Sequence, residues 1–315
     1  MRFARHAWLF SFLLAVPASA PAQTVTDGQW LLERGDQAGF VRLTLSYGTR
    51  PENNSWTNDD VPLRQLDGLT AEAWQGSGVV VHFRIVRDAG TLACDGWFDR
   101  GKGSGHFAYT ASTQFVAELA RRGIGAPSAE QQFQMTMANL GIDLVDELAR
   151  EGYERPSVDG LTRMATHGVD RAYLLSLDSA HYRLGTPAAL IRTRDHGVDR
   201  DFIAELDAAG YRNLSVEDLV RVRDHGVDGD FIEEMRDAGY KPSDIEELVE
   251  TRDHGVDARY AKELKDVGLH DLSLSQLRRA RDHGLTAGFV RRVASHGYTS
   301  LSLDELIRLR DRGLD

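Results

Sequence analysis

Two spacings of apolar residues divide the chain into two parts. Before about residue 112, apolar and polar residues alternate, as they do at Val41, Leu43 and Leu45. A period of two predicts β-strands with one buried face. After that point, apolar residues recur every three or four positions in short blocks, which predicts amphipathic helices. We therefore predict an α+β protein, with a small antiparallel β-rich domain over residues 23–112 and an α-solenoid of short helix pairs over residues 113–315.

Turn-forming residues separate the strands of the first part. Asp88–Gly90 predicts a hairpin turn that leads into a strand over Thr91–Phe98. The glycine-rich segment Asp99–Gly105 predicts a second turn, because a phosphate-binding loop needs GxxxxGK[ST] ahead of a helix. The polar segment Asn53–Asp60 is also expected to be a turn, and Pro62–Leu69 is expected to hold one short helical turn.

The second part is a sequence repeat. The hexapeptide RDHGVD occurs at Arg194–Asp199, Arg223–Asp228 and Arg252–Asp257, with degraded copies on either side. Its glycine recurs every 29 residues, at Gly168, Gly197, Gly226, Gly255, Gly284 and Gly313. A fixed period of this length indicates a repeat architecture. Because helices of about ten residues are marginal alone, each unit must bury its apolar stripe against its neighbours, which predicts a solenoid of about seven units.

Each unit predicts two helices, as Leu214–Tyr240 illustrates. Ser215 is the N-cap of the first helix. His225 ends that helix, Gly226 takes the left-handed conformation, and Asp228 caps the second helix. The same roles in the three best copies belong to His196, Gly197, Asp199, His225, Gly226, Asp228, His254, Gly255 and Asp257. The N-cap position of the first helix holds Ser128, Ser157, Thr186, Ser215, Asp244, Ser273 and Ser302.

Three departures mark the ends and the middle of the array. The segment Phe115–Ile124 matches Phe202–Tyr211, so the array begins before the first hexapeptide. Gly141 is two residues out of phase, which fits an atypical N-terminal capping unit. His181 replaces the glycine that ends a second helix, and we expect it to adopt the left-handed conformation. The sequence closes with a lone first helix, which could act as a cap or accept a partner's helix.

The arginine and aspartate that open each hexapeptide have no role in the predicted helix stop. We expect them to form an Arg–carboxylate ladder between units, which contributes specificity more than stability. They are also the side chains at which we expect recognition to occur. This candidate interaction surface consists of Arg194, Asp195, Arg223, Asp224, Arg252, Asp253, Arg281 and Asp282.

The periodic histidines allow three interpretations. A zinc ladder is disfavoured, because units about 10 Å apart cannot share an ion that needs ligands at about 2 Å. We favour histidines that bond the free carbonyl groups at the end of a helix. A stack that becomes charged near pH 6 and senses pH is the alternative. No catalytic, cofactor-binding or metal-binding residue is assigned, and no cofactor is expected.

The β-rich part holds few candidates for chemistry. Cys94 is the only cysteine, which precludes an intramolecular disulfide, and we expect it to be a buried apolar residue. His82 and His106 are expected to face solvent without binding a metal. The tryptophans at 30, 56, 74 and 97 are expected to fill the core, and the alternative is a surface platform for sugars.

The N-terminus has the pattern of a secretory signal peptide. Arg2 and Arg5 precede the apolar segment Ala7–Val16 and a run of small residues, so residues 1–22 are the predicted signal, cleaved before Gln23. The apolar run is too short for a membrane anchor, and we expect no membrane insertion after signal removal. Losing two arginines makes the net charge of −11 more negative. An acidic exported chain is a poor candidate for binding nucleic acid, and we expect a periplasmic or secreted protein.

The segment FRIVRDAGTLACDGWFDRGKGSGHFAY, followed by repeated RDHGVDxxFIxEL and DAGY units, resembles a bacterial exported module. The module is similar to the extracytoplasmic C-terminal regions of some antirepressor-type membrane metallopeptidases, the beta-lactam-sensor family. This chain lacks the HExxH motif and the membrane helices of those peptidases. The resemblance therefore implies neither proteolysis nor transmembrane signalling.

These features predict a non-enzymatic cell-envelope scaffold, open to a regulatory role, whose helical repeats bind an envelope protein or peptide. The alternative is a sensor or binding module in which the β domain holds a carbohydrate or a small ligand. A hydrolase would need catalytic groups that the fold brings together from distant positions, because GxSxG, HExxH and SxxK motifs are absent. The sequence does not predict the oligomeric state.

Overall fold

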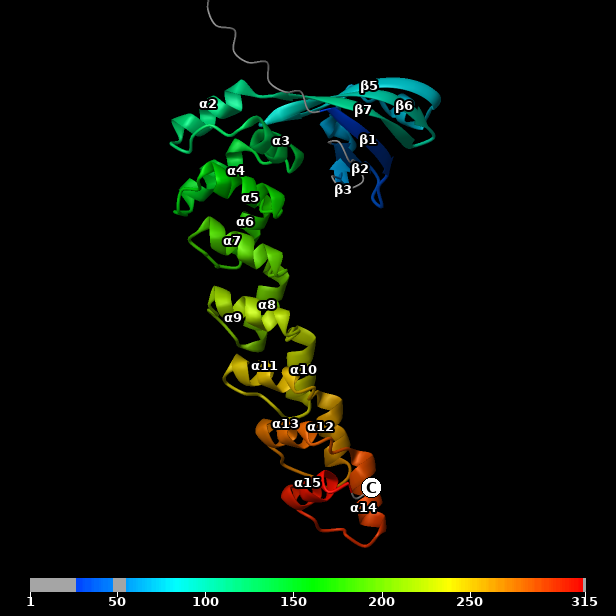
Figure 1. Cartoon of the computed structure of the whole chain (residues 1–315), viewed down its shortest axis with the longest axis vertical. Coiled ribbons are helices and arrows are strands. Elements are labelled where there is room, and N and C mark those ends of the chain that lie inside the picture. The colour runs from blue at the N-terminus through cyan, green and yellow to red at the C-terminus, as the bar shows by residue number, and fades with distance from the viewer. Residues whose placement is uncertain (1–26, 48–54, 314–315) are drawn as a thin grey trace, which may run out of the picture.

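A curled β-sheet and a long stack of short helices make up the protein (Figure 1). The computed structural model describes residues 27–47 and 55–313, so the predicted signal peptide at residues 1–22 lies outside the described residues. The sheet occupies one end, and the helices extend away from it in a single column. The predicted α+β fold in two parts is confirmed. Within the described ranges, no helix combines the length and the apolar character needed to cross a bilayer.

In the described residues, seven strands form one antiparallel sheet in the order β3-β2-β1-β7-β6-β5-β4. The chain builds one half with β1 to β3, crosses to the far edge, and returns until β7 pairs with β1. The strands are β1 (Asp27–Arg34), β2 (Phe40–Tyr47), β3 (Ser55–Pro62), β4 (Leu66–Asp67), β5 (Ser77–Arg87), β6 (Gly90–Asp99) and β7 (Lys102–Ala111). A 3-10 turn, η2 (Leu63–Gln65), precedes β4, and α1 (Ala71–Gln75) precedes β5.

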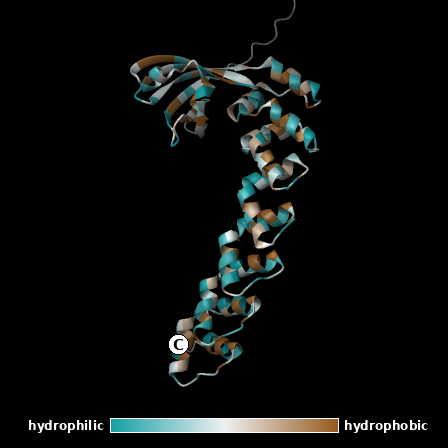
Figure 2. Cartoon of the chain, turned by 180° about the vertical axis from the view of Figure 1, so that it is seen from behind, coloured by the Kyte–Doolittle hydropathy of each residue, from teal (hydrophilic) through white to brown (hydrophobic). Residues whose placement is uncertain are grey.

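The helical array alternates two kinds of helix, and each kind stacks on its own kind. The first helices are α3 (Ala129–Met137), α5 (Val158–Thr166), α7 (Pro187–Asp195), α9 (Val216–Asp224), α11 (Ile245–Asp253), α13 (Leu274–Asp282) and α15 (Leu303–Asp311). The second helices are α2 (Thr113–Arg121), α4 (Ile142–Arg150), α6 (Arg171–Ser179), α8 (Arg200–Ala209), α10 (Gly229–Asp237), α12 (Ala258–Lys265) and α14 (Ala287–Ser295). Hydrophobic and hydrophilic residues alternate within each helix pair, as expected when every pair buries one stripe (Figure 2).

The predicted helix ends are confirmed. The side chain of Ser215 accepts a hydrogen bond from the backbone N–H of Asp218, whose side chain accepts one from the backbone of Ser215. At the helix end, the N–H of Val227 donates to the carbonyl oxygen of Val222 at 3.0 Å, which closes the left-handed stop. His181 adopts a φ of 62° where the other units have glycine. Local capping chemistry therefore sets the length of each helix.

Aromatic side chains fill the buried face of the sheet. The ring centroid of Trp30 lies 5.0 Å from that of Phe83 and 5.6 Å from that of Phe98. The indole fits because Gly96 has no side chain: a Cβ there would lie 2.4 Å from the Trp30 ring. Trp74 of α1 packs on Phe98 and closes one end of this core.

Helix α3 completes the core of the sheet. Phe133 and Met137 of α3 are buried among sheet residues, and the Phe133 ring lies 5.0 Å from the ring of Tyr109. Arg87, the last residue of β5, donates hydrogen bonds to the carbonyl oxygens of Thr136 and Met137 at 2.6 and 2.5 Å. Burial lowers the pKa of Arg87 to about 10, so the guanidinium remains charged at neutral pH. The boundary near residue 112 falls between β7 and α2, yet α3 of the array contributes to the core of the sheet, while the array also has a core of its own.

Two predictions for the β-rich part are wrong. Most of the segment predicted as a polar turn over residues 53–60 belongs to β3, because Thr57 and its neighbours pair with β2. The turn predicted over residues 99–105 is confined to Arg100 and Gly101, whose φ values are 50° and 83°. Gly103 lies in β7 instead, where a Cβ would stand 2.4 Å from the ring of Phe98. Glycine was needed there for close packing and not for a loop.

Candidate functional site

The aspartate and histidine of the repeated motif meet between neighbouring units. Nδ1 of His196, the C-cap residue of α7, lies 2.7 Å from Oδ1 of Asp224 at the end of α9. The same 28-residue separation recurs in His167–Asp195, His225–Asp253, His254–Asp282 and His283–Asp311. The histidines do end their helices, as predicted. Their Nδ1 atoms face a carboxylate of the next unit, so the predicted bond to free carbonyl groups is wrong.

The motif arginine also joins two units. The guanidinium of Arg223 lies over the ring of Phe202, 4.9 Å from its centroid, and its Nε is 3.6 Å from the place a Cβ would take on Gly197. Equivalent stacking occurs in Arg194–Tyr173, Arg252–Phe231, Arg281–Tyr260 and Arg310–Phe289. A cation over an aromatic face stabilises by about 0.5–1 kcal/mol at an exposed site. The arginine and aspartate of the motif therefore have structural partners that the helix stop did not reveal.

An Arg–carboxylate ladder between units exists, but it uses other arginines than those predicted. Arg192, two residues before the motif, lies 2.5 Å from Glu217 of the next unit. The equivalent pairs are Arg221–Glu246 and Arg279–Asp304, at 2.5 and 2.6 Å. One unit reverses the charge at this position. Glu250 replaces the arginine there and contacts Arg278 at 2.9 Å.

The candidate interaction surface remains open to solvent although its members have partners. All eight of its arginine and aspartate side chains are exposed. At each boundary between two units, which we call a seam, the aspartate that contacts a histidine keeps 39% to 48% of its side-chain area in contact with solvent. The array therefore presents a row of charged side chains whose orientations are fixed by their neighbours. A recess of about 610 Å³ lies between α10 and α12 and is lined by Glu234, Asp237, Lys262 and Lys265.

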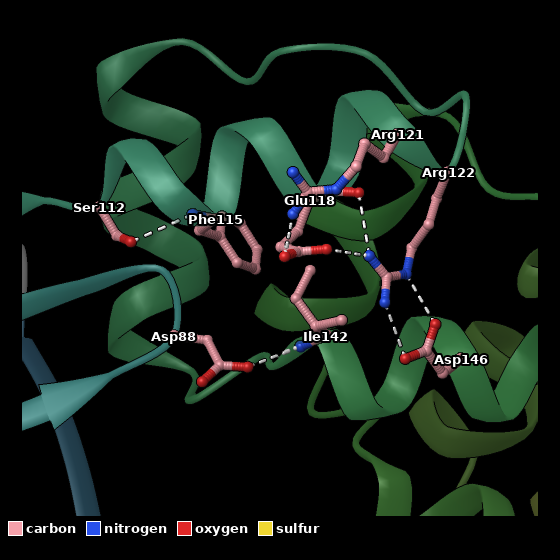
Figure 3. A network of polar contacts seen from close by, with 8 residues as sticks. All are labelled: Asp88, Ser112, Phe115, Glu118, Arg121, Arg122, Ile142 and Asp146. Atoms are coloured by element: carbon pink, nitrogen blue, oxygen red, sulfur yellow. Dashed lines mark hydrogen bonds and ion pairs between the residues drawn. The ribbon is translucent and has the colours of Figure 1, made fainter.

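Charged contacts also hold the joint between the sheet and the array (Figure 3). Asp88, in the turn between β5 and β6, accepts a hydrogen bond from the backbone N–H of Ile142 at 2.9 Å. It thereby caps α4, whose own N-cap residue is a glycine. Arg122 of the loop after α2 contacts both carboxylate oxygens of Asp146 at 2.6 and 2.9 Å and also bonds Glu118. These hydrogen bonds hold the pKa of Asp146 below its usual value.

The candidate chemical groups of the sheet lie on opposite faces. Cys94 is buried, and burial raises the pKa of its thiol to about 12, so the thiol is neutral at physiological pH. His82 and His106 both face solvent, as predicted. Asp95 lies between them across the strands, and its Oδ1 is 2.5 Å from Nδ1 of His82. Among the residues with a described placement, no group of three or more His, Cys, Asp or Glu side chains is arranged to hold a metal ion.

The four tryptophans divide between the two predicted roles. Trp30 and Trp74 are buried in the core. Trp56 is partly buried beneath the guanidinium of Arg87, which lies 5.3 Å from its ring centroid. Trp97 is 53% exposed and lies on the solvent face of the sheet. Only the last of these four can offer its ring to a ligand without rearrangement of the core.

Comparison with known proteins adds no relatives. No protein-family model matches the chain, and no match was found among curated proteins or solved structures.

Proposed function

We propose that the protein is a non-enzymatic scaffold of the bacterial cell envelope that binds another protein or a peptide along its helical array. The observation that carries this proposal is the division of positions within the repeat. The Arg, Asp, His and Gly of the motif recur in four successive units, at Arg194–Gly197, Arg223–Gly226, Arg252–Gly255 and Arg281–Gly284. An exposed position at the centre of the second helices instead changes, being occupied by Ala204, Glu233, Lys262 and Arg291 in successive units.

A regular stack with a variable exterior is suited to extended protein recognition. Solenoids present long surfaces, and each unit contributes a few side chains to a partner without disturbing the core. Here the recurring Arg, Asp and His side chains lie at the seams between units, and the variable positions lie at the centres of the second helices. The envelope location rests on the signal pattern at residues 1–22. The non-enzymatic role is supported by the buried, neutral thiol of Cys94 and by seam histidines that are engaged in structural pairs.

Site-specific photo-crosslinking in the native cell tests this proposal with the full chain intact. A photoreactive amino acid is placed singly at Glu233 or Lys262 on the array and, as a matched control, at Asp36 in the exposed turn after β1. We expect one discrete protein adduct from the array positions and none from Asp36. The proposal fails if no array position yields an adduct, or if Asp36 yields the same adduct with equal efficiency.

Neutralising two aspartates of the candidate interaction surface tests which surface the partner uses. Replacing Asp224 and Asp253 by Asn keeps the side-chain size and removes two charges from the candidate interaction surface. Loss of the adduct, with the far-ultraviolet circular dichroism unchanged, would assign recognition to that row. Retention of the adduct would assign recognition to the variable positions of the second helices.

A further inference from the structure

A row of polar side chains crosses the solvent face of the sheet. It contains one residue from each of five neighbouring strands: His82 on β5, Asp95 on β6, His106 on β7, Gln29 on β1 and Ser46 on β2. Each member stands directly opposite the next in the strand register. Adjacent strands lie about 4.8 Å apart, so a ligand laid along this row can reach several of these side chains at once.

An exposed tryptophan flanks the polar row. Trp97 lies two residues from Asp95 on the same face of β6, between Val80 and Ser104 on the neighbouring strands. Its side chain is 53% exposed, whereas large aromatic residues normally bury most of their area. The structure supplies no aromatic partner for this ring among the residues described. The ring is therefore available to stack on a ligand.

The face is hollowed at this place. Two adjoining recesses, of about 570 and 450 Å³, share the side chains of Gln29, Ser46, Asp95 and His106. Trp97 lines the larger recess. Gly96, Gly105 and Ser104 add little side-chain bulk to the lining of the larger recess, and Leu31, which is 41% exposed, also lines it. The polar row thus lies at the bottom of a shallow groove that ends at an aromatic wall.

The acceptor in the groove is oriented in advance. His82 fixes Asp95 through the contact between Nδ1 and Oδ1, which leaves Oδ2 of the carboxylate without a hydrogen-bond partner in the described structure. The side chains of His106 and Gln29 likewise make no hydrogen bond to described residues. The groove therefore offers a carboxylate acceptor, an amide that both donates and accepts, and an imidazole, all exposed to solvent.

We propose that this groove binds a neutral, hydroxyl-rich glycan, a site separate from the protein-binding role of the array. The apolar face of a sugar ring stacks on Trp97, and its hydroxyl groups donate to Asp95 and exchange hydrogen bonds with Gln29 and His106. Among the residues that the structure describes, no Lys or Arg lines either recess, so anionic ligands such as phosphates find no counter-charge there. A purely apolar ligand would leave the polar row unsatisfied beneath it.

Titration of the full chain with defined oligosaccharides tests this assignment. The probes are the hexamers of N-acetylglucosamine, of β-1,4-linked glucose and of α-1,4-linked glucose, each up to 10 mM. Binding is followed by calorimetry and by the NMR signals of the tryptophan indole N–H groups. We expect one hexamer to bind and to shift the Trp97 signal. Trp97→Ala and Asp95→Asn should each weaken binding by at least tenfold.

The control is Val86→Ala, which removes a 59% exposed apolar side chain from the same sheet face outside both recesses. It should bind as the unaltered protein does. Unchanged thermal unfolding of the Trp97 and Asp95 variants establishes that they fold. The assignment is overturned if none of the three hexamers binds, or if a hexamer binds equally to the unaltered protein and to folded Trp97→Ala and Asp95→Asn variants.

Discussion

Nδ1 of His196 and Oδ1 of Asp224 lie 2.7 Å apart across a seam between two units, although 28 residues separate them in the chain. The same bond crosses five successive seams in the described array. Because an ionised aspartate can only accept a hydrogen bond, Nδ1 of the histidine donates it. Each unit is thereby tied to its immediate neighbour and to no other, which is the nearest-neighbour coupling expected of a linear repeat protein.

A double-mutant cycle should detect this bond. His196→Ala and Asp224→Ala should each lower the free energy of unfolding, and the two losses should overlap by about 0.2–1 kcal/mol because the pair is half-exposed. Urea unfolding, followed by circular dichroism, measures the free energy of unfolding of the unaltered protein, the two single variants and the double variant. Asp230→Ala, which removes an exposed carboxylate from the same unit, should change stability little. Strictly additive losses would show that the contact contributes nothing.

The arginine stack should depend on the planar guanidinium and not on charge alone. Arg252→Lys keeps the charge but loses the flat contact with the Phe231 ring, whose centroid is 4.8 Å away. We expect a loss of about 0.5–1 kcal/mol in the free energy of unfolding. Arg259→Lys on α12 is the matched control, because Arg259 is exposed and makes no ring contact within the described chain. Equal stability of the two variants would contradict the stacking role.

The contribution of α3 to the core of the sheet predicts where the chain can be cut. A fragment of residues 23–112 lacks α3, so the sheet residues that Phe133 and Met137 cover would be exposed. We expect this fragment to aggregate or to bind a hydrophobic dye. A fragment of residues 23–156 retains α2 to α4 and should be monomeric and unfold cooperatively. Size-exclusion chromatography and thermal unfolding compare the two fragments, and a well-folded short fragment would show that the sheet does not need α3.

The buried tyrosines of the array should make it sensitive to alkali. The hydroxyl of Tyr260 donates to the carbonyl oxygen of Leu285 at 2.8 Å, and burial raises its pKa to about 12. The pKa of tyrosine in an unfolded chain is about 10, so the unfolded chain loses this proton at a lower pH than the folded chain does. The free energy of unfolding therefore holds its value below pH about 10 and falls as the pH rises towards 12.

Urea unfolding between pH 9 and 12 measures this slope. Tyr260→Phe should make the slope shallower, because one group that titrates differently in the two states is gone. Tyr298→Phe removes a hydroxyl from a side chain that is 61% exposed and should leave the slope as it was. The interpretation fails if both variants change the slope equally.

Cys94 should report on the integrity of the sheet. Its thiol is buried and its pKa is about 12, so almost no reactive thiolate is present at pH 8. We expect the native protein to react slowly with a thiol reagent and the urea-unfolded protein to react at once. Moving the thiol one residue, in Ala93→Cys combined with Cys94→Ala, places it on the exposed face. That variant should react rapidly while folded, and fast reaction of native Cys94 would contradict its burial.

Local signals in the sequence were sufficient for most of the fold. The caps at Ser215 and Asp228 and the left-handed Gly226 act within a few residues, so the helix boundaries could be read directly. The sheet was harder, because the pairing of Thr57 with β2 overrides the turn-like composition of its segment. Strand pairing is a property of distant residues and leaves no sign in local composition.

The missed parts of the candidate sites are contacts between distant positions. Asp95 stands opposite both His82 and His106 only because three strands bring them into register. The partner of each seam histidine could have been suspected from the constant 28-residue spacing to an aspartate. Spacing alone could not show which of the periodic arginines meets a carboxylate and which meets a ring.

The contacts between units described above join residues 21, 25 or 28 positions apart, within a period of 29. Inserting or removing one whole period in the interior of the array leaves each bond with an equivalent partner. Any other change in length would leave a histidine, an arginine and an aspartate mismatched at once. The distance between the sheet and the far end of the column can therefore evolve only in discrete steps, each adding about 10 Å of helix stacking. The repeat thus allows only whole-unit changes in the length of the array.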